Sequence, residues 1–297
     1  MKIFITGATG YIGGSAALHL RRAGHHIRGL VRDPEKVSLL TEIAIEPVLG
    51  DLENIDLLIH EARQADAVVN AANSDDEGAV DAFLLALQGS GKSLIHTSGT
   101  SVIGDAAGGN SLSKTLFEEK NPLIVPPEKQ ARRNIDLKVL AARGMRGIVL
   151  CNSLIYGEGK LPNTQSVQIP LLVNQALESG VVRIVGKGLN SWSNVHIDDL
   201  CEIYRLAIES APAGAFYFVE NGESSFFDVG RAIAERLHLA GLESWTEEEA
   251  AKVWGLARAR YSLGSNSRVK SIRARKEIGW NPNHGSVIEW IRNEMKV

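Results

Sequence analysis

Three glycines near the start of the chain have the spacing of a phosphate-binding turn. Gly7, Gly10 and Gly13 stand in T-G-A-T-G-Y-I-G, between the apolar run Lys2–Thr6 and the helical pattern Tyr11–Ala23. The first glycine permits a tight turn, the second lets backbone approach a pyrophosphate, and the third lets the helix pack on its strand. The helix N-terminus then offers free N–H groups to the phosphates. A purely structural glycine turn is the alternative, but the strand–turn–helix context favours a dinucleotide site. The candidate contacts are Gly7, Thr9, Gly10, Tyr11, Ile12 and Gly13.

Short apolar runs alternate with helical stretches through the first half of the chain. Further strands are predicted at His26–Val31, Ile45–Leu49, Ala67–Ala71, Ser93–Thr97 and Arg146–Leu150. Helices are predicted between them at Ile55–Arg63, Val80–Leu87 and from about Glu128 to Arg143. Such alternation implies right-handed crossovers between parallel strands. The fold class is therefore α/β, a Rossmann-type doubly wound parallel sheet.

The alternation becomes less regular after Gly157. We expect residues 1–160 to form the dinucleotide-binding domain and residues 161–297 to form mainly a smaller substrate-binding lobe. Parts of 195–220 are expected to return to the first domain, so the two are interleaved.

The glycine motif and six later motifs resemble the extended and atypical short-chain dehydrogenase/reductases, the NAD-dependent epimerase/dehydratase superfamily. The later motifs are G-D-L at Gly50–Leu52, N-A-A at Asn70–Ala72, T-S-G-T-S-V-I-G at Thr97–Gly104, N-S-L-I-Y-G-E-G at Asn152–Gly159, V-H-I-D-D-L at Val195–Leu200 and R-A-R-K-E-I-G-W at Arg273–Trp280. The resemblance covers essentially the whole chain. It implies that Asp51 and Leu52 flank the adenine, Ala71 and Ala72 the cofactor ribose, and Asn152 and Ser153 the nicotinamide carboxamide.

The end of the second predicted strand favours NADP(H) over NAD(H). A carboxylate there would bind the ribose 2′-hydroxyl and repel a 2′-phosphate. That position holds Val31, and the next residue is Arg32, whose guanidinium can pair with a 2′-phosphate. Arg28 and Lys36 add positive charge nearby. The alternative is that Arg32 is a solvated loop arginine.

The usual proton donor of the superfamily is missing. Reductases that the chain resembles use Tyr-x-x-x-Lys on the helix before the strand Arg146–Leu150, where the lysine lowers the phenol pKa. The resemblance places this motif at Pro126–Gln130, which contains no tyrosine. Tyr156 with Lys160 is a formal match, but two glycines between them argue against a helix that would align the pair.

Three residues are candidates to replace the missing acid. Ser98 or Thr100 can hold the substrate oxygen, because Gly99 occupies the position where relatives have a serine or threonine. The alternative for both is capping of the strand end. Lys129 can polarise a carbonyl as a cation, or it can be a solvated lysine at a helix start.

A second cluster, His196 with Asp198 and Asp199, suggests a metal or a His–Asp pair. No third ligand has helical or turn spacing. Capping of the following helix by Asp198 or Asp199 is therefore favoured, and no metal is expected.

Composition excludes several classes of partner. Lys and Arg number 32 against 35 Asp and Glu, a net charge of −3, which argues against nucleic acid or an anionic membrane surface. No apolar run is long enough to cross a membrane or to form a signal peptide. Two cysteines are too few for a disulfide framework. We expect a cytoplasmic protein with a small-molecule substrate, and a homodimer remains open.

Three functions are compatible with these residues. The first is an NADPH-dependent reductase of a small carbonyl or an activated double bond. The second is a protein that senses NADP(H) without catalysis. The third, a nucleotide-sugar epimerase or dehydratase, needs the missing base and usually retains NAD, so it is disfavoured.

Overall fold

A seven-stranded parallel sheet forms the centre of the computed structural model, which describes residues 1–162 and 164–296. Its strand order is β11-β7-β5-β4-β1-β2-β3. In chain order the strands are β1 (Lys2–Thr6), β2 (His26–Val31), β3 (Glu46–Leu49), β4 (Ala67–Asn70), β5 (Ser93–Gly99), β7 (Arg146–Asn152) and β11 (Ala215–Val219). The Rossmann-type doubly wound sheet predicted from the sequence is confirmed.

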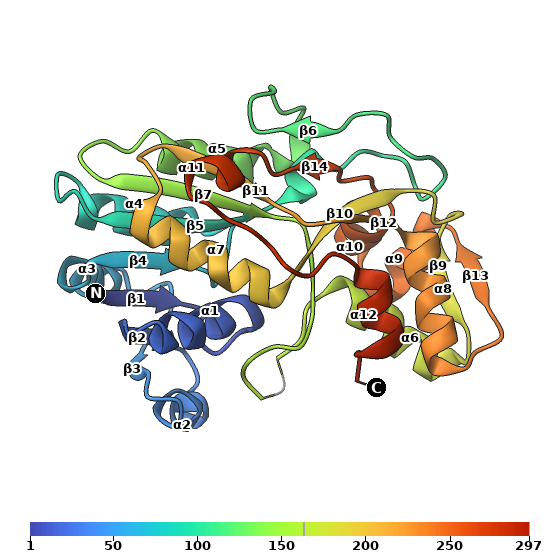
Figure 1. The fold of residues 1–297 in the computed structure, drawn as a ribbon, viewed down its shortest axis with the longest axis horizontal. Helices are drawn as coiled ribbons and strands as arrows, with labels where there is room; N and C mark the ends of the chain where they lie inside the picture. Colours follow the sequence, from blue (N-terminus) through green and yellow to red (C-terminus); the bar gives the residue numbers. More distant parts are fainter. Residues whose placement is uncertain (163, 297) are drawn as a thin grey trace.

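Helices cover both faces of this sheet (Figure 1). On one face lie α1 (Tyr11–Arg22) and α7 (Ile197–Ser210), whose apolar residues share a core with the inward side chains of β1 and β7. On the other lie α3 (Ile55–Gln64), α4 (Glu77–Leu87) and α5 (Gln130–Leu140) with a second core. Because the strands are buried on both faces, they are continuous apolar runs rather than alternating patterns.

Later parts of the chain return to the sheet. Strand β11 pairs with β7 in parallel, and α7 packs against α1. The short helix α11 (Arg273–Glu277) contacts β11. Shorter helices, α2 (Val37–Thr41) and α10 (Leu256–Arg258), lie in the connections.

A smaller group of elements lies beyond the carboxyl ends of the strands, to the right in Figure 1. It contains α6 (Gln168–Ser179), α8 (Phe226–Leu237), α9 (Glu247–Trp254), α12 (Val287–Asn293) and the parallel pair β9 (Val182–Val185) and β13 (Leu242–Trp245). These helices and strands share a third core. The remaining strands of the described residues form a three-stranded sheet and a separate pair. The sheet contains β8 (Leu154–Tyr156), β10 (Ser191–His196) and β12 (Glu223–Ser225), and the pair is β6 (Phe117–Glu118) with β14 (Val269–Lys270).

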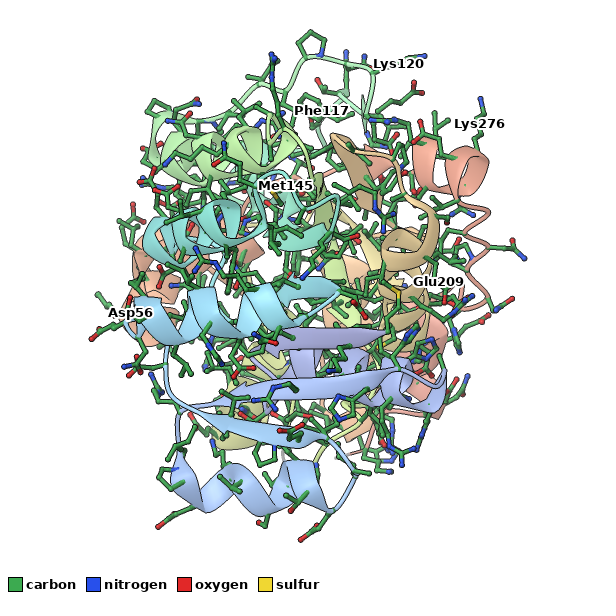
Figure 2. The ribbon with its side chains drawn as sticks, turned by 90° about the vertical axis from the view of Figure 1, so that its left-hand side faces the viewer. Asp56, Phe117, Lys120, Met145, Glu209 and Lys276 are labelled. Atoms are coloured by element: carbon green, nitrogen blue, oxygen red, sulfur yellow. The ribbon has the colours of Figure 1, made fainter. Side chains whose placement is uncertain are left out.

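Figure 2 draws the side chains on the ribbon and labels four charged and two apolar residues. The labelled charged residues Asp56, Lys120, Glu209 and Lys276 are exposed, whereas Phe117 and Met145 are buried. Within residues 1–162 and 164–296, no helix combines the length and the apolar character that crossing a membrane requires.

Candidate functional site

The glycine turn after β1 brings the N-terminus of α1 against the sheet. Gly7 has φ +70°, and a Cβ there would lie 2.8 Å from the carbonyl oxygen of Ala71. A Cβ on Gly13 would lie 2.3 Å from the carbonyl oxygen of Gly7. The N-cap of α1 is Gly10, which has no side chain to cap the helix, and the first turn contains no acid. The first N–H groups of α1 are therefore free to bind an anion.

A cleft of about 870 Å³ opens in front of this turn. Its walls are the ends of the sheet strands and the segment Gln165–Gln168. The predicted cofactor residues that line it are Gly7, Thr9, Gly10, Tyr11, Ile12, Gly13, Arg32, Asp51, Leu52, Ala71, Ala72 and Ser153. Asn152 is the one predicted cofactor residue that does not line the cleft.

The hydroxyl of Thr6 fixes the cleft wall at the end of β4. It accepts hydrogen bonds from the backbone N–H groups of Ala71 (3.1 Å) and Ala72 (3.2 Å) and donates to Asn70 Oδ1 (2.7 Å). The end of β4 is thereby held beside the glycine turn.

Asn152 is buried behind the cleft wall. Its amide nitrogen lies 3.5 Å from the hydroxyl of Tyr204 on α7, and that hydroxyl lies 2.6 Å from Thr97 Oγ1. The neighbouring Ser153 donates its hydroxyl hydrogen to the carbonyl oxygen of Val219 at 2.7 Å. Of the two residues proposed for the carboxamide, Ser153 is thus the one that borders the cleft.

Arg32 is the only cationic side chain among the described residues that line the cleft. It lies directly after β2, and its neighbour Asp33 caps the 3-10 turn Pro34–Lys36, accepting from the N–H of Glu35 at 3.0 Å. The charge of Arg28, expected to add to the positive potential nearby, is paired with Glu61 and Glu46. Arg32 is therefore the cation among the described lining residues that can bind an anion at this end of the cleft.

The three predicted catalytic residues lie in different environments. Ser98 is buried, and its hydroxyl donates to Asp136 Oδ2 at 3.2 Å on the side of the sheet that faces α5. Thr100 is fully buried, and Lys129 Nζ lies over the ring of Tyr261, 4.7 Å from its centroid. None of the three lines the 870 Å³ cleft, and their catalytic roles stay predictions.

Asp136 is a buried carboxyl group with three polar neighbours. Besides the Ser98 hydroxyl, Arg133 Nη1 lies 3.5 Å and His96 Nε2 3.8 Å from its oxygens. Burial raises the pKa of Asp136 to about 6, although the Ser98 hydrogen bond and the Arg133 charge oppose the shift. Burial, together with the charge of Arg132, lowers the pKa of His96 to about 4.

The raised pKa of Asp136 predicts a pH-dependent cost. The folded chain binds this proton more tightly than the unfolded chain, so protonation of Asp136 stabilises the fold. This stabilisation is complete below pH 3.8 and is lost as the pH rises through 6. We expect Asp136→Asn to gain stability relative to wild type over this range, by up to about 3 kcal/mol. Urea unfolding at pH 4.5 to 7.5 measures it, with the exposed Asp56→Asn as the control. A difference that does not vary with pH contradicts the assignment.

Two residues beside the cleft were not predicted from the sequence. The guanidinium of Arg132 on α5 makes a bidentate pair with the carboxylate of Asp75, with Nε donating to Oδ1 at 2.6 Å. Its Nη1 donates to Ser101 Oγ at 3.1 Å. Asp75 and Arg132 are 57 positions apart, and no sequence spacing signals their pairing. The only sequence signal is the basic run of residues 129–133.

Tyr156 and Lys160 do not form the tyrosine–lysine pair of a reductase. Tyr156 is buried, its hydroxyl donates to the carbonyl oxygen of His284 at 3.2 Å, and burial raises its pKa well above the usual range. Lys160 Nζ is paired with Asp198 at 2.6 Å. The two side chains have separate partners, as their turn sequence predicted.

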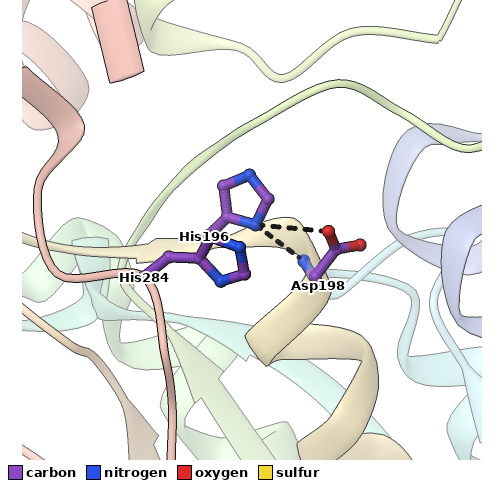
Figure 3. A group of neighbouring side chains, drawn as sticks. All are labelled: His196, Asp198 and His284. Atoms are coloured by element: carbon purple, nitrogen blue, oxygen red, sulfur yellow. Dashed lines mark hydrogen bonds and ion pairs between the residues drawn. The ribbon is translucent and has the colours of Figure 1, made fainter. Parts of the chain in front are cut away.

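The His196 cluster holds the start of α7 and the C-terminal segment together (Figure 3). His196 and His284 stack with ring centroids 3.9 Å apart, and one ligand atom each of His196, Asp198 and His284 lies within 4.8 Å of the others. His196 Nδ1 already accepts from the N–H of Asp198, so His196 is the N-cap of α7, where an aspartate was expected. Burial and the neighbouring His284 lower the pKa of His196 to about 4. The cluster therefore has a structural explanation.

The model of the NAD dependent epimerase/dehydratase family matches residues 3–218. Oxidase ucsJ of Acremonium sp is 32% identical over 325 residues, covering 95% of this chain and 92% of that protein. A 4-hydroxy-2-methyl-3-oxo-4-farnesyl-3,4-dihydroquinoline-1-oxide ketoreductase of Stigmatella aurantiaca is 25% identical over 318 residues, covering 94% and 92%. The solved dTDP-glucose 4,6-dehydratase of Bacillus anthracis, in complex with NAD, superposes with a TM-score of 0.77 at 22% identity, covering 98% of this chain and 94% of that one. The match to that structure extends over nearly the whole fold.

Proposed function

Because this chain belongs to the NAD dependent epimerase/dehydratase family, we propose that it is an NADPH-dependent reductase of a small carbonyl or an activated carbon–carbon double bond. The observation that carries this proposal is the 870 Å³ cleft, which has a glycine turn and a helix N-terminus in one wall and Arg32 in another. The name of the ketoreductase relative supports carbonyl reduction, and that of the oxidase relative supports redox chemistry.

Different parts of the cleft suit different parts of one dinucleotide. The free N–H groups that follow Gly10 suit a pyrophosphate. Gly7 and Gly13 let the end of β4, the turn and α1 pack closely, because a Cβ on either would lie within 3 Å of backbone atoms. Arg32 suits a ribose 2′-phosphate, and Asp51 with Leu52 would flank the adenine. Ala71 and Ala72 would hold the ribose. Ser153 would hold the carboxamide, together with Asn152, which lies behind it. When bound, the reduced nicotinamide supplies a hydride.

Arg32 is expected to set the cofactor preference. We expect Arg32→Asp to weaken NADPH binding roughly tenfold to a hundredfold, since a charge-assisted hydrogen bond is worth about 1.5–3 kcal/mol. NADH binding is expected to change little, because NADH has no 2′-phosphate. Fluorescence titration with both dinucleotides measures this, with the exposed Arg22→Asp as a control for the charge change. Equal affinities of the wild type for NADPH and NADH would contradict the preference.

The buried hydroxyls beside the cleft favour a second candidate, a sensor of NADP(H) that does no chemistry. The Ser98 hydroxyl is bonded to Asp136, the Thr100 hydroxyl is fully buried, and Tyr11 donates its hydroxyl to the carbonyl oxygen of Gly157 at 2.8 Å. Of these three residues only Tyr11 lines the cleft, and its hydroxyl hydrogen is already donated to a backbone carbonyl.

NADPH consumption separates the two candidates. The reductase proposal expects steady NADPH oxidation with some member of a panel of small aldehydes, ketones and enones. Tight NADPH binding with no turnover across the panel would favour the sensor, and a partner protein bound in only one redox state would support it further.

A further inference from the structure

Arg132 presents a fixed cation where the carboxyl ends of β4, β5 and β7 meet. Asp75 accepts hydrogen bonds from Nε and from one N–H of Nη2, and the Ser101 hydroxyl accepts from one N–H of Nη1. A guanidinium has five N–H donors, so one on Nη1 and one on Nη2 remain. Burial disfavours charge on Arg132, but the hydrogen bonds and charge of Asp75 outweigh it and raise the pKa. The guanidinium therefore stays charged at neutral pH.

Gly99 lies next to this cation and has room for a Cβ without a close contact. A Cβ built on Gly99 would meet only two atoms within 4 Å, the carbonyl oxygen of Asn152 at 3.8 Å and Nη1 of Arg132 at 3.9 Å. Gly99 pairs in register with Asn152, and the next residue, Ser153, lines the cleft. On the other side, the cleft residue Asn73 lies two positions before Asp75. Gly99 and Arg132 do not themselves line the cleft, but the chain neighbours of their partners Asn152 and Asp75 do.

The other two cations at the start of α5 are engaged elsewhere. Lys129 Nζ lies over the ring of Tyr261. Arg133 is paired with the buried Asp136, and its guanidinium lies over Phe216, 5.0 Å from the ring centroid. Of these three side chains, Arg132 is the one with donors next to Gly99.

We propose that Arg132, held in place by Asp75 and Ser101, binds the substrate oxygen that gains negative charge during reduction. This inference rests on the proposed reductase function. When the hydride adds to a carbonyl carbon, the electron pair of the C=O π bond moves to the oxygen. A preorganised donor at that oxygen stabilises the charge. A guanidinium does not give up its proton, so the oxygen takes a proton from water, which leaves hydroxide.

Three variants test this assignment. Arg132→Met removes the charge, and Arg132→Lys keeps the charge but loses the planar set of guanidinium N–H donors. Arg143→Met is the matched control, because it removes an exposed arginine further along the same segment. Oxalate is the probe, because its binding to an oxyanion site can be measured without turnover. Its affinity is determined by calorimetry on protein saturated with NADP⁺. NADPH titration and thermal unfolding establish that cofactor binding and folding persist.

We expect Arg132→Met to weaken oxalate binding at least tenfold and to lower kcat/KM for the carbonyl substrate roughly 10²–10³-fold, as for the loss of one oxyanion donor. Arg132→Lys is expected to fall between wild type and Arg132→Met in both. Both Arg132 variants are expected to bind NADPH with wild-type affinity. Arg143→Met is expected to match the wild type in oxalate binding and in kcat/KM. Wild-type protein that does not bind oxalate, or Arg132→Met that binds it and turns over normally, overturns the assignment of Arg132. Failure of the wild type to bind NADPH overturns the proposed function instead.

Discussion

Replacing Gly13 by alanine is expected to abolish dinucleotide binding and to destabilise the fold. The new Cβ would lie 2.3 Å from the carbonyl oxygen and 2.7 Å from the carbonyl carbon of Gly7. Both are backbone atoms, so either the glycine turn or α1 must move. We expect a loss of about 1–3 kcal/mol in the free energy of unfolding. We also expect the Kd for NADPH to rise roughly a hundredfold or more, which corresponds to about 3 kcal/mol.

Gly78→Ala is the matched control for this change. Gly78 lies in α4, and the nearest atom to its added Cβ is Asp76 Oδ1 at 3.6 Å. There the substitution is expected to stabilise the helix by roughly 0.5–1 kcal/mol and to leave NADPH binding unchanged. Fluorescence titration and urea unfolding measure both quantities. If Gly13→Ala bound NADPH as the wild type does, the cleft would not be the dinucleotide site.

The second large effect is expected at Asp199, which fastens the C-terminal segment to α7. Its buried carboxylate accepts from the backbone N–H groups of Asn283 and His284, each at 2.9 Å, and from His284 Nδ1 at 3.1 Å. Removing it leaves two backbone N–H groups and the His284 ring nitrogen without their charged acceptor. We expect Asp199→Ala to lower the free energy of unfolding by roughly 2–4 kcal/mol. The hydrogen bond from the Trp280 indole to the backbone carbonyl of Asp199 does not depend on this side chain.

The adjacent aspartate distinguishes this loss from a general effect of charge removal. Asp198 is partly exposed and pairs with Lys160 at the surface, so Asp198→Ala is expected to cost less than about 1 kcal/mol. Urea unfolding of the two variants at pH 7 gives the comparison. Equal losses from the two substitutions would show that the carboxylate of Asp199 has no special structural role.

Patterns within a few residues were sufficient to predict the sheet. The strands Lys2–Thr6 and His26–Val31 have their predicted bounds, because each is an apolar run with a clear start and stop. Strand β5 extends two residues past its prediction, to Gly99, because pairing with β7 continues there. The glycine turn was predictable for the same reason, since its turn, its strand and its helix are contiguous in the sequence.

Contacts between distant segments could not be predicted in this way. The pairing of Arg132 with Asp75 depends on how α5 lies over the ends of β4 and β5. Likewise, Asn152 was assigned to the cofactor on its motif, but its amide lies beside Tyr204, 52 positions later. Ile135 and Val139 illustrate the limit. From sequence alone, apolar residues at this helical spacing are equally compatible with a subunit interface and with the core. In the structure both side chains are packed in the core beside β5 and β7.

The most direct measurement is the fate of the hydrogen at C4 of NADPH. The wild type is incubated with a reducible carbonyl from the panel and with NADPH deuterated at C4 on either face, and the product is analysed by mass spectrometry. The proposed reductase predicts a product that carries one deuterium from one of the two labelled cofactors. NADPH that stays bound and unchanged, with no deuterium in any product across the panel, would contradict it.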